Sequence, residues 1–457
     1  MRVSLSCLAL VALLSPAAAW SADEPPLTVT VYSDNFAMIQ EVRGLHLSRG
    51  LQEYRITDVP SQIEPTSVRF RSLTAPDTVT LQEQRFEFDL AETGRLLERY
   101  LGQPVVVTIE EGGTFRGTLL NANAGDAILQ LEDGAVQVVK AQAITTLQFP
   151  ALPGGLTTKP TLVWLLESTK SAKHDVQISY LTKGIQWTAE YTAGFSEKEG
   201  RLELSGWASI ENRSGQTFKD ARLRLVAGTL HRVSPQPYRV PEGMRREVAM
   251  MASAAPAPGF EEKPLFEYHL YTLDRPATLA DMQTEQLALF PPTSVKADKE
   301  FSYDGAQDQN QVRVNLVLEN TKENGLGRPL PGGRIRVYKE AGGKPAVFVG
   351  EDQIGHMAEG EEARVYVGNA FDIVGERTVT ETRQISKRSR QETVEIQLRN
   401  RKDTPATVTV IEHFRGDWKF IGTTPKIRKK EANKVEFEVN VPKQGEQTFS
   451  YQVLYTW

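Results

Sequence analysis

Alternation of apolar and polar residues is the feature that most restricts the fold of this chain. It runs through segments spread over much of the length: LTVTVY (27–32), FEFDL (86–90), VRVNLVLEN (312–320), VEIQLRN (394–400), ATVTVI (406–411), VEFEVNV (435–441) and TFSYQVLYTW (448–457). Successive side chains of a β-strand point to opposite faces, so each segment has one apolar and one polar face. The pattern is typical of antiparallel strands with one face on a core, and it predicts a mainly β fold.

Few segments carry a helical pattern. The segment 89–103, DLAETGRLLERYLGQ, places leucines on one face, with Asp89 positioned to cap its start and Gly102 to end it. A helix is predicted there. The segment 275–290 has Pro276 near its start, and it stays open between a helix and a loop that leads into an edge strand.

Five short strands are predicted after this helix, between residues 104 and 150. Gly117 lies at the centre of the second strand, where a strongly curved sheet needs a residue without a side chain. The sequence EDG at 132–134 is suited to a hairpin turn. A helix followed by five short strands is the element order of small Sm/SH3-like barrels, so such a barrel is predicted over 89–150.

The first residues predict an exported protein. Arg2 precedes an apolar run over 3–14, and small residues follow at 17–19. The run is shorter than the roughly 20 residues of a membrane-spanning helix. This favours a cleaved secretory signal over a retained anchor. We expect cleavage near Ala19, with Ala22 as the second candidate, and a periplasmic or secreted mature chain.

The position of cysteine and the pattern of hydropathy exclude several kinds of site from the mature chain. Cys7 is the only cysteine and lies within the expected signal. The mature chain would then contain no disulfide, no thiolate metal site and no cysteine nucleophile. No later stretch is long and apolar enough to form a membrane-spanning helix, so we expect no transmembrane segment in the mature chain.

The length of 457 residues points to several domains, because single cores rarely extend beyond about 250–300 residues. The expected organisation is a signal peptide (1–19), an N-terminal β module (23–88) that packs with a later β-sandwich (151–243), the helix and small barrel (89–150), a flexible linker or loop (244–264) and a C-terminal β-sandwich region (265–457).

A weak internal repeat favours sandwich modules. In three places an apolar strand ends at an asparagine, a polar loop follows, and an alternating strand returns; the landmarks are Asn212, Asn320 and Asn400. Asparagine suits a strand exit because it tolerates left-handed backbone and hydrogen-bonds nearby backbone groups. Units of this kind fit immunoglobulin-like β-sandwiches.

The distribution of charge argues against nucleic acid as a partner. The formal net charge is -5, and loss of Arg2 with the signal leaves the mature chain at -6. Residues 89–150 contain eight acidic and four basic residues, a net charge of -4. Clustered Lys and Arg supply most nucleic-acid affinity. We therefore expect no nucleic-acid binding.

Motifs for catalysis or cofactor binding are not found in the sequence. It contains no H-E-x-x-H, no G-x-S-x-G and no P-loop, and the six histidines are not spaced as metal ligands. His269 and His413 lie beside aromatic and acidic residues, but a packed or surface histidine is the usual case. The oxygen-rich YDGAQDQN (303–310) lacks EF-hand spacing. We predict no catalytic, cofactor-binding or metal-binding residue and no cofactor.

Tryptophans offer a further kind of site, because exposed indoles stack on sugars. The candidates are Trp164, Trp187, Trp207, Trp418 and Trp457. Most lie in alternating strands, where tryptophan usually fills a core. We predict a core position for each.

Several separated motifs resemble one known family. They are VTVYSDNFAMIQEVRGLHLSRG near the start, ISYLTKGIQWTAEYTA (178–193), FEYHLYTLDRPATLADMQTEQLALF (266–290), LPGGRIRVYKE (330–340) and VYVGNAFDIVGERT (365–378). Together they resemble exported bacterial proteins that carry the domain of unknown function DUF4139. The resemblance implies a secreted or periplasmic, largely β protein. It implies no activity, substrate or catalytic residue.

These observations lead to one principal functional hypothesis and two alternatives. The principal hypothesis is an exported cell-envelope protein that binds or scaffolds an envelope protein or a glycan without catalysis. The first alternative is an exported hydrolase whose site assembles from distant loops, which sequence spacing does not reveal. The second is a glycan-binding protein that uses exposed aromatic residues.

Overall fold

The computed structural model describes residues 26–88, 93–110, 112–123, 126–151, 159–228, 230–232, 260–265, 268–341, 344–422 and 426–457. In these residues the chain is mainly β, as the alternation predicts. The expected signal (1–19) and residues 244–259 of the expected linker lie outside them, whereas residues 260–264 lie in strand β16 (Phe260–Leu265). No helix in this part of the chain is long and apolar enough to cross a membrane.

One mixed sheet gathers strands from residues 27–279. Its order is β16, β17 (Tyr268–Leu273), β15 (Phe218–Ala227), β1 (Leu27–Tyr32), β2 (Phe36–Leu47), β12 (Ala172–Lys183) and β4 (Arg69–Ser72), with β18 (Ala277–Leu279) paired to β15. A smaller sheet has the order β3 (Gly50–Ile56), β11 (Thr161–Ser168) and β5 (Val79–Glu87). Short 3-10 turns at Pro65–Ser67 and Pro76–Thr78 precede β4 and β5.

A longer sheet runs through the rest of the chain. Its order is β22 (Lys344–Ile354), β21 (Gly333–Ala341), β13 (Ile185–Ser196), β14 (Arg201–Asn212), β19 (Gln283–Tyr303), β20 (Gln311–Glu319), β23 (Glu362–Ser386), β24 (Ser389–Asn400), β29 (Gly445–Thr456) and β26 (Asp417–Ile421). A second layer branches from β19 through β25 (Ala406–His413), β28 (Lys434–Val441) and β27 (Ile427–Lys430), paired in that order.

The segment 275–290 is not a helix. It forms β18 and the first part of β19. Within the described residues, 283–296 of β19 pair with β14, whereas β20 pairs with 297–302, so the segment leads into a stretch of strand that is paired on one side, as the alternative of an edge strand predicts. Leu287, Leu289 and Phe290 of this segment are buried, whereas Met282 is exposed, and the burial of the alternate residues outweighs the helical pattern. The prolines at 291–292 fall where the register with β14 shifts, a place in a sheet where a missing backbone N–H is tolerated.

Strand direction also differs from the expectation of antiparallel pairing. Among the described strands, β1 pairs with β15, β13 with β21 and β19 with β25 in parallel ladders. Alternation indicates which face of a strand is buried, but it carries no information about the direction of the neighbouring strand. In β1, moreover, the polar Thr28 and Thr30 are buried, so both faces of that strand are covered.

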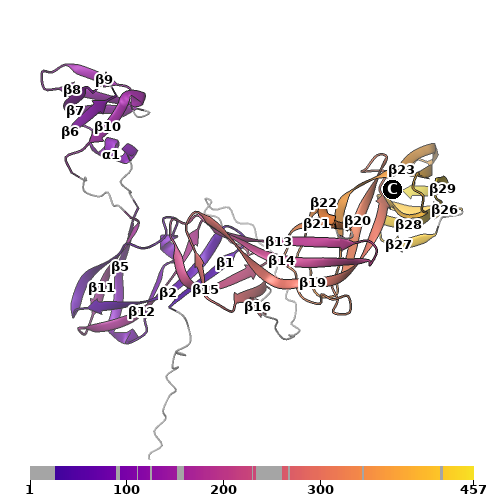
Figure 1. Ribbon diagram of the computed structural model, residues 1–457, viewed down its shortest axis with the longest axis horizontal. Helices are drawn as coiled ribbons and strands as arrows, with labels where there is room; N and C mark the ends of the chain where they lie inside the picture. The colour runs from indigo at the N-terminus through magenta and orange to yellow at the C-terminus, as the bar shows by residue number, and fades with distance from the viewer. Residues whose placement is uncertain are drawn as a thin grey trace, which may run out of the picture.

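Two large buried clusters hold these sheets together. The first contains side chains from the mixed sheet, the smaller sheet and the first half of the longer sheet. The second lies between the β25–β28 layer and the β23–β24–β29 layer, and Ile396, Phe437 and Tyr451 belong to it. The second cluster is the core of a β-sandwich, which is the packing that alternating strands predict. Figure 1 shows β1, β2 and β12 toward one end of the molecule and this sandwich at the other.

Residues 93–151 form a small module with its own core. α1 (Thr93–Arg99) precedes β6 (Pro104–Ile109), β7 (Thr114–Asn123), β8 (Asp126–Leu131), β9 (Val136–Val139) and β10 (Ile144–Gln148). These strands form a sheet in the order β10-β6-β7-β8-β9, on which Leu97 of α1 packs. The expected sequence of one helix and five strands is confirmed.

Closure of this sheet into an Sm/SH3-like barrel is not confirmed. Within the described residues, β9 and β10 stand at opposite edges of the sheet and do not pair. β9 is only four residues long, and a 3-10 turn at Ala141–Ala143 carries the chain from it directly to β10. The sheet is therefore open at these two edges.

The three landmark asparagines have the same role in the fold, which is to hydrogen-bond loop carbonyls through their side chains. The left-handed backbone expected for them is not found. None of them has the positive φ of left-handed backbone. Each is buried, and each side-chain amide donates to carbonyls of the loop after its own strand and of a neighbouring segment. Asn400 Nδ2, for example, donates to Thr404 O at 2.9 Å and to Pro442 O at 3.1 Å. Asn212 and Asn320 make corresponding pairs of bonds.

Substitution of Asn400 by alanine is expected to lower the free energy of unfolding of the C-terminal sandwich by about 2 kcal/mol, because buried carbonyls lose their donor. Chemical denaturation measures the effect. Asn433→Ala is the matched control, since Asn433 is exposed and its loss should change stability by less than about 0.5 kcal/mol. Equal effects of the two substitutions would contradict the role assigned to Asn400.

Candidate functional site: a groove and a polar network

A groove of about 570 Å³ crosses the small module. It is lined by residues of β6, β7 and β8, by the turn that follows β8, and by the end of β10; the lining residues are Pro104, Val105, Val106, Arg116, Gly117, Thr118, Gln130, Leu131, Glu132, Gly134, Gln148 and Pro150. Proline and valine form its apolar part, while glutamine amides and one residue of each charge supply donors and acceptors. Such a lining suits noncovalent binding of a ligand with both apolar and polar groups.

Gly117 is required by the spacing of the two strands beneath the groove. It pairs with Leu131 of β8, and a Cβ atom at this position would lie 2.4 Å from the carbonyl oxygen of Gln130. A side chain there would push β8 away from β7. The prediction that Gly117 serves a bend in the second strand is thus refined: the glycine permits a close approach of two backbones.

The small module is inserted into a hairpin of the smaller sheet. β5 ends at Glu87 and β11 begins at Thr161, and these two residues are direct antiparallel partners. Residues 88–160 therefore leave the sheet and return to it at one point, without interrupting the β5–β11 ladder. Insertions in such loops are the positions where folds commonly carry binding residues.

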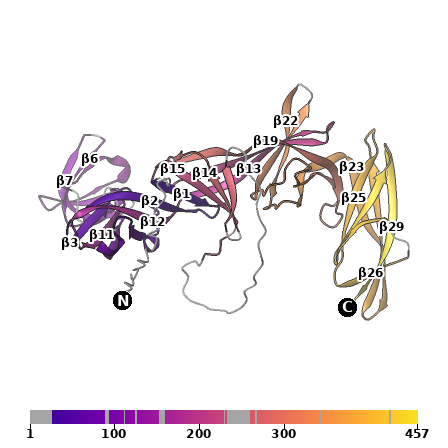
Figure 2. The ribbon, with the colours of Figure 1, turned by 90° about the horizontal axis from the view of Figure 1, so that it is seen from below.

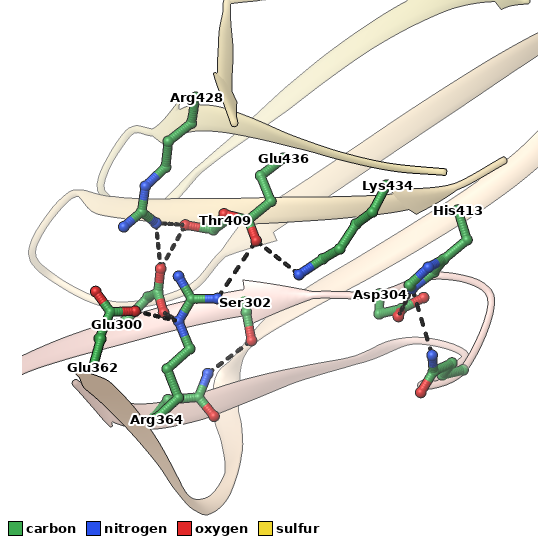
Figure 3. A network of polar contacts seen from close by, with 12 residues as sticks. Glu300, Ser302, Asp304, Glu362, Arg364, Thr409, His413, Arg428, Lys434 and Glu436 are labelled. Atoms are coloured by element: carbon green, nitrogen blue, oxygen red, sulfur yellow. Dashed lines mark hydrogen bonds and ion pairs between the residues drawn. The ribbon is translucent and has the colours of Figure 1, made fainter. Parts of the chain in front are cut away.

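A second candidate is the polar network shown in Figure 3. Arg364 of β23 is its centre: Nε lies 3.1 Å from Oε2 of Glu300, and Nη1 lies 3.4 Å from Oε1 of Glu436. The contact with Glu300 is an ion pair without the alignment of a hydrogen bond. Glu300 and Glu436 come from β19 and β28, so the network ties β23 to the β25–β28 layer of the sandwich.

Further groups complete the pairing of the two glutamates. Arg428 contacts Glu300 directly and donates to Thr409 Oγ1 at 2.8 Å. Lys434 Nζ lies 2.9 Å from Oε1 of Glu436. Burial alone raises the pKa of Glu436, but Lys434 and Arg364 outweigh it, so the pKa of this carboxyl is below its ordinary value. The carboxylates are already compensated by cations of the chain, which is an arrangement for holding layers together.

His413 makes a contact with a carboxylate. Its Nε2 lies 2.8 Å from Oδ2 of Asp304, and the amide nitrogen of Gln307 lies 3.5 Å from the same Nε2 (Figure 3). The other oxygen of Asp304 accepts from the backbone N–H of Ala306 at 3.1 Å. Asp304 orients the imidazole, and the ring is partly open to solvent.

Other histidines and acidic residues considered from the sequence as site residues make hydrogen bonds or ion pairs within the fold. The buried His174 has Nδ1 3.4 Å from the Ser72 hydroxyl, and His356 Nδ1 accepts from the Gly332 N–H at 3.0 Å. In the oxygen-rich stretch 303–310, Asp308 pairs with Arg313 rather than pointing to a common centre. No group of three potential metal ligands occurs in the part of the chain described here.

The tryptophans divide between core and surface. Trp164 and Trp187 are buried as expected, and Trp418 packs against the sandwich core. Trp207 and Trp457 are exposed, 39 % and 63 % respectively, so the core prediction is wrong for them. Trp207 lies within β14 and Trp457 follows β29, and alternation does not reveal which face of an outer layer remains uncovered.

The network residues carried no signal in the sequence. Glu300, Arg364 and Glu436 lie on strands that are remote from one another along the chain, and charged residues at alternating positions are expected on any solvated strand face. The pairing of β19 with β20 and of β20 with β23 brings Arg364 near Glu300, and the pairing of β19 with β25 and of β25 with β28 brings Glu436 to them. For the groove, the sequence predicts the strands and a bend at Gly117, but not the close approach of β7 and β8 that the structure shows.

Replacement of Arg364 by methionine is expected to lower the free energy of unfolding by about 2 kcal/mol, because Glu300 and Glu436 lose a cation in a partly desolvated site. Equilibrium denaturation measures it. Arg401→Met removes an exposed ion pair with Glu446 and should cost less than about 1 kcal/mol. If Arg364→Met and Arg401→Met had the same free energy of unfolding, the network would not stabilise the contact between the two layers of the sandwich.

A second prediction concerns how the stability of the fold depends on pH. Lys299 and Lys339 hydrogen-bond Glu197 and hold its pKa at about 2, below the ordinary value of 4.5. Since the folded-state pKa is depressed, this carboxylate stabilises the fold above pH 4.5, and the contribution is lost as the pH falls from 4.5 toward 2. Denaturation of the native chain and of Glu197→Gln should therefore converge in this interval. An unchanged difference between them down to pH 2 would contradict the prediction.

Comparison with known proteins connects most of this architecture to one family. The family model for the domain of unknown function DUF4139 matches residues 176–457. A search of curated proteins finds no match. The matched region begins within β12 and contains the polar network, whereas the small module and its groove precede it.

Proposed function

The chain belongs to the DUF4139 family, and from that premise we propose that it is an exported protein of the cell envelope that binds or scaffolds a partner without catalysing a reaction. The contact site is the groove of the small module. The partner is an envelope protein or a glycan. The family region supplies the framework that carries the module.

The insertion of the small module is the observation that carries this proposal. The module has a separate core, leaves and rejoins the smaller sheet at the paired residues Glu87 and Thr161, and contains the groove. A module attached in this way can vary its ligand without altering the packing of the framework, because no framework ladder passes through it. The charge of -4 over 89–150 favours a partner other than nucleic acid.

Export is supported by the sequence of the first residues. Arg2, the short apolar run and the small residues at 17–19 have the order of a secretory signal. A chain without cysteine after this segment is also suited to an oxidising compartment, because it has no thiol to mispair.

The hydrolase alternative finds support in one contact. Asp304 orients His413 as a general base would be oriented. Among the described residues, the imidazole contacts Asp304 and Gln307 and no hydroxyl group, so the geometry supports a positioning role for the pair within the β19–β25 junction. The glycan alternative has weaker support, because the exposed Trp207 and Trp457 lie on different strands of distant segments.

Site-specific photo-crosslinking in intact cells tests the proposal. p-Benzoylphenylalanine at Thr118, within the groove, should capture one dominant envelope component, identified by mass spectrometry. The same probe at Leu51, an exposed residue of β3 outside the module, is the control. Gln130→Arg, at the lining position of β8 that pairs directly with Thr118, should abolish the capture. Cleavage near Ala19 is checked on the same material by N-terminal sequencing.

Several outcomes would contradict the proposal. Equal capture from positions 118 and 51, or none from either, would reject the groove as the contact site. A chain that stays in the cytoplasm with residues 1–19 intact would reject export. A hydrolytic activity of the purified protein that His413→Ala abolishes without loss of stability would replace the binding function by the enzymatic alternative.

A further inference from the structure

One end of the C-terminal sandwich concentrates exposed cations. The turn between β23 and β24 contains Lys387 and Arg388, and β26 with the residues before it contributes Arg415 and Lys419; all four side chains are exposed. Within the described part of the chain none of these four takes part in an ion pair. Other basic residues of the sandwich, such as Arg377 and Arg364, are instead paired with glutamates.

The pairing of strands brings these cations to one place. β24 and β26 are the two neighbours of β29: Arg390 lies opposite Tyr455, and Trp418 lies opposite the same Tyr455. The backbone N–H of Trp457 donates to the carbonyl of Arg388 at 3.0 Å. Neighbouring strands lie about 4.8 Å apart, so the 387–388 turn and the 415–419 segment are about 10 Å apart across the end of β29. Figure 2 shows this end, where the C-terminus lies beside β26.

Acidic groups in this area do not cancel the positive charge. Glu392 is engaged by Arg390, whose Nη2 lies 2.9 Å from its Oε1. Asp417, opposite Thr456 in β29, is the acidic residue within β26. The four unpaired cations therefore leave a local surplus, although the whole chain has a formal charge of -5. A local excess of this kind, opposite in sign to the whole, attracts anions to one end of the molecule.

Apolar side chains are exposed among these cations. Trp457 is 63 % exposed and Ile385, two residues before Lys387, is 50 % exposed. A soluble anion would neutralise the cations but would leave these two side chains in water. A bilayer surface satisfies both requirements, because lipid phosphates lie beside the interfacial layer in which indole and aliphatic side chains are stable.

We propose that this end of the sandwich, formed by Lys387, Arg388, Arg415, Lys419, Trp457 and Ile385, binds the surface of a membrane that contains anionic lipids. The cations contact the phosphates, and the indole and the isoleucine enter the interface. The inference adds a membrane contact to the proposed envelope role and rests on it only for the compartment. The contact is peripheral, and it leaves the groove of the small module free for a partner.

Vesicle sedimentation of the purified chain from residue 20 onward tests the inference. Vesicles of phosphatidylcholine with phosphatidylglycerol should bind the protein at least tenfold more tightly than phosphatidylcholine alone, and high salt should remove the difference, since each basic residue near an anionic surface contributes about 1 kcal/mol. Lys387→Glu/Arg388→Glu should weaken binding at least tenfold. Trp457→Ala should weaken it severalfold without changing its dependence on salt.

The matched control separates a local surface from overall charge. Lys170→Glu/Lys198→Glu changes the net charge by the same amount at exposed positions outside the sandwich, and it should bind as the unaltered chain does. Thermal melting confirms that the variants fold. Equal binding to both kinds of vesicle, equal loss in the control, or equally tight binding to a single-stranded RNA oligonucleotide would overturn the membrane assignment.

This experiment fails or succeeds independently of the test of the groove. Vesicle binding is measured on purified protein, whereas the photo-crosslink at Thr118 reports a partner in the cell. A protein that binds vesicles but shows no capture at Thr118 keeps the membrane contact and loses the groove. The opposite pair of results keeps the groove and loses the membrane contact.

Discussion

The continuity of β19 is the constraint on which the rest of the architecture depends. Its first part pairs with β14, and its last part pairs with β20 and β25. One unbroken strand thus contributes to both large cores, and its backbone pairs with β14 up to Lys296 and with β20 from Ala297 onward. A flexible connection at this point would let the sandwich rotate. A shared strand fixes it, and the Arg364 network adds a charged contact between the layers on the same strand.

The parts of this fold that the sequence anticipates are those that depend on near neighbours in the chain. β1, β7 and β28 follow from local alternation, and Gly117 follows from its place within a strand. The parallel pairing of β19 with β25 could not be predicted from the sequence. Alternation of apolar and polar residues depends on which face of a strand is buried, and it is the same whether the partner strand is parallel or antiparallel. The network of Glu300, Arg364 and Glu436 depends on that pairing and is equally invisible.

Two errors have the same physical origin. Trp207 lies within β14 and Trp457 follows β29, both in segments with good alternation, and the pattern alone could not show that these side chains stay exposed. The open edges of the small module are a different case. Five strands with the expected turns predict a barrel, yet β9 and β10, which one 3-10 turn joins, stand at opposite edges of the sheet and do not pair in the described residues. Closure depends on strand length and tilt, which alternation does not report.

Basic side chains are paired with carboxylates where they hold the layers together, and among the described residues the four at the end of the sandwich that we assign to a partner are unpaired. Arg364 and Arg377 of β23 pair with carboxylates of the opposite layer, Glu436 of β28 and Glu412 of β25, and these pairs stabilise the relative position of the layers. At the 387–388 turn the cations lack such partners, although acidic residues are frequent along the chain. Unpaired like charges repel one another and reduce stability, so their proximity is a cost to the fold. A contact with an anionic surface would remove that cost, and this is the physical reason to assign the end of the sandwich to recognition rather than to architecture.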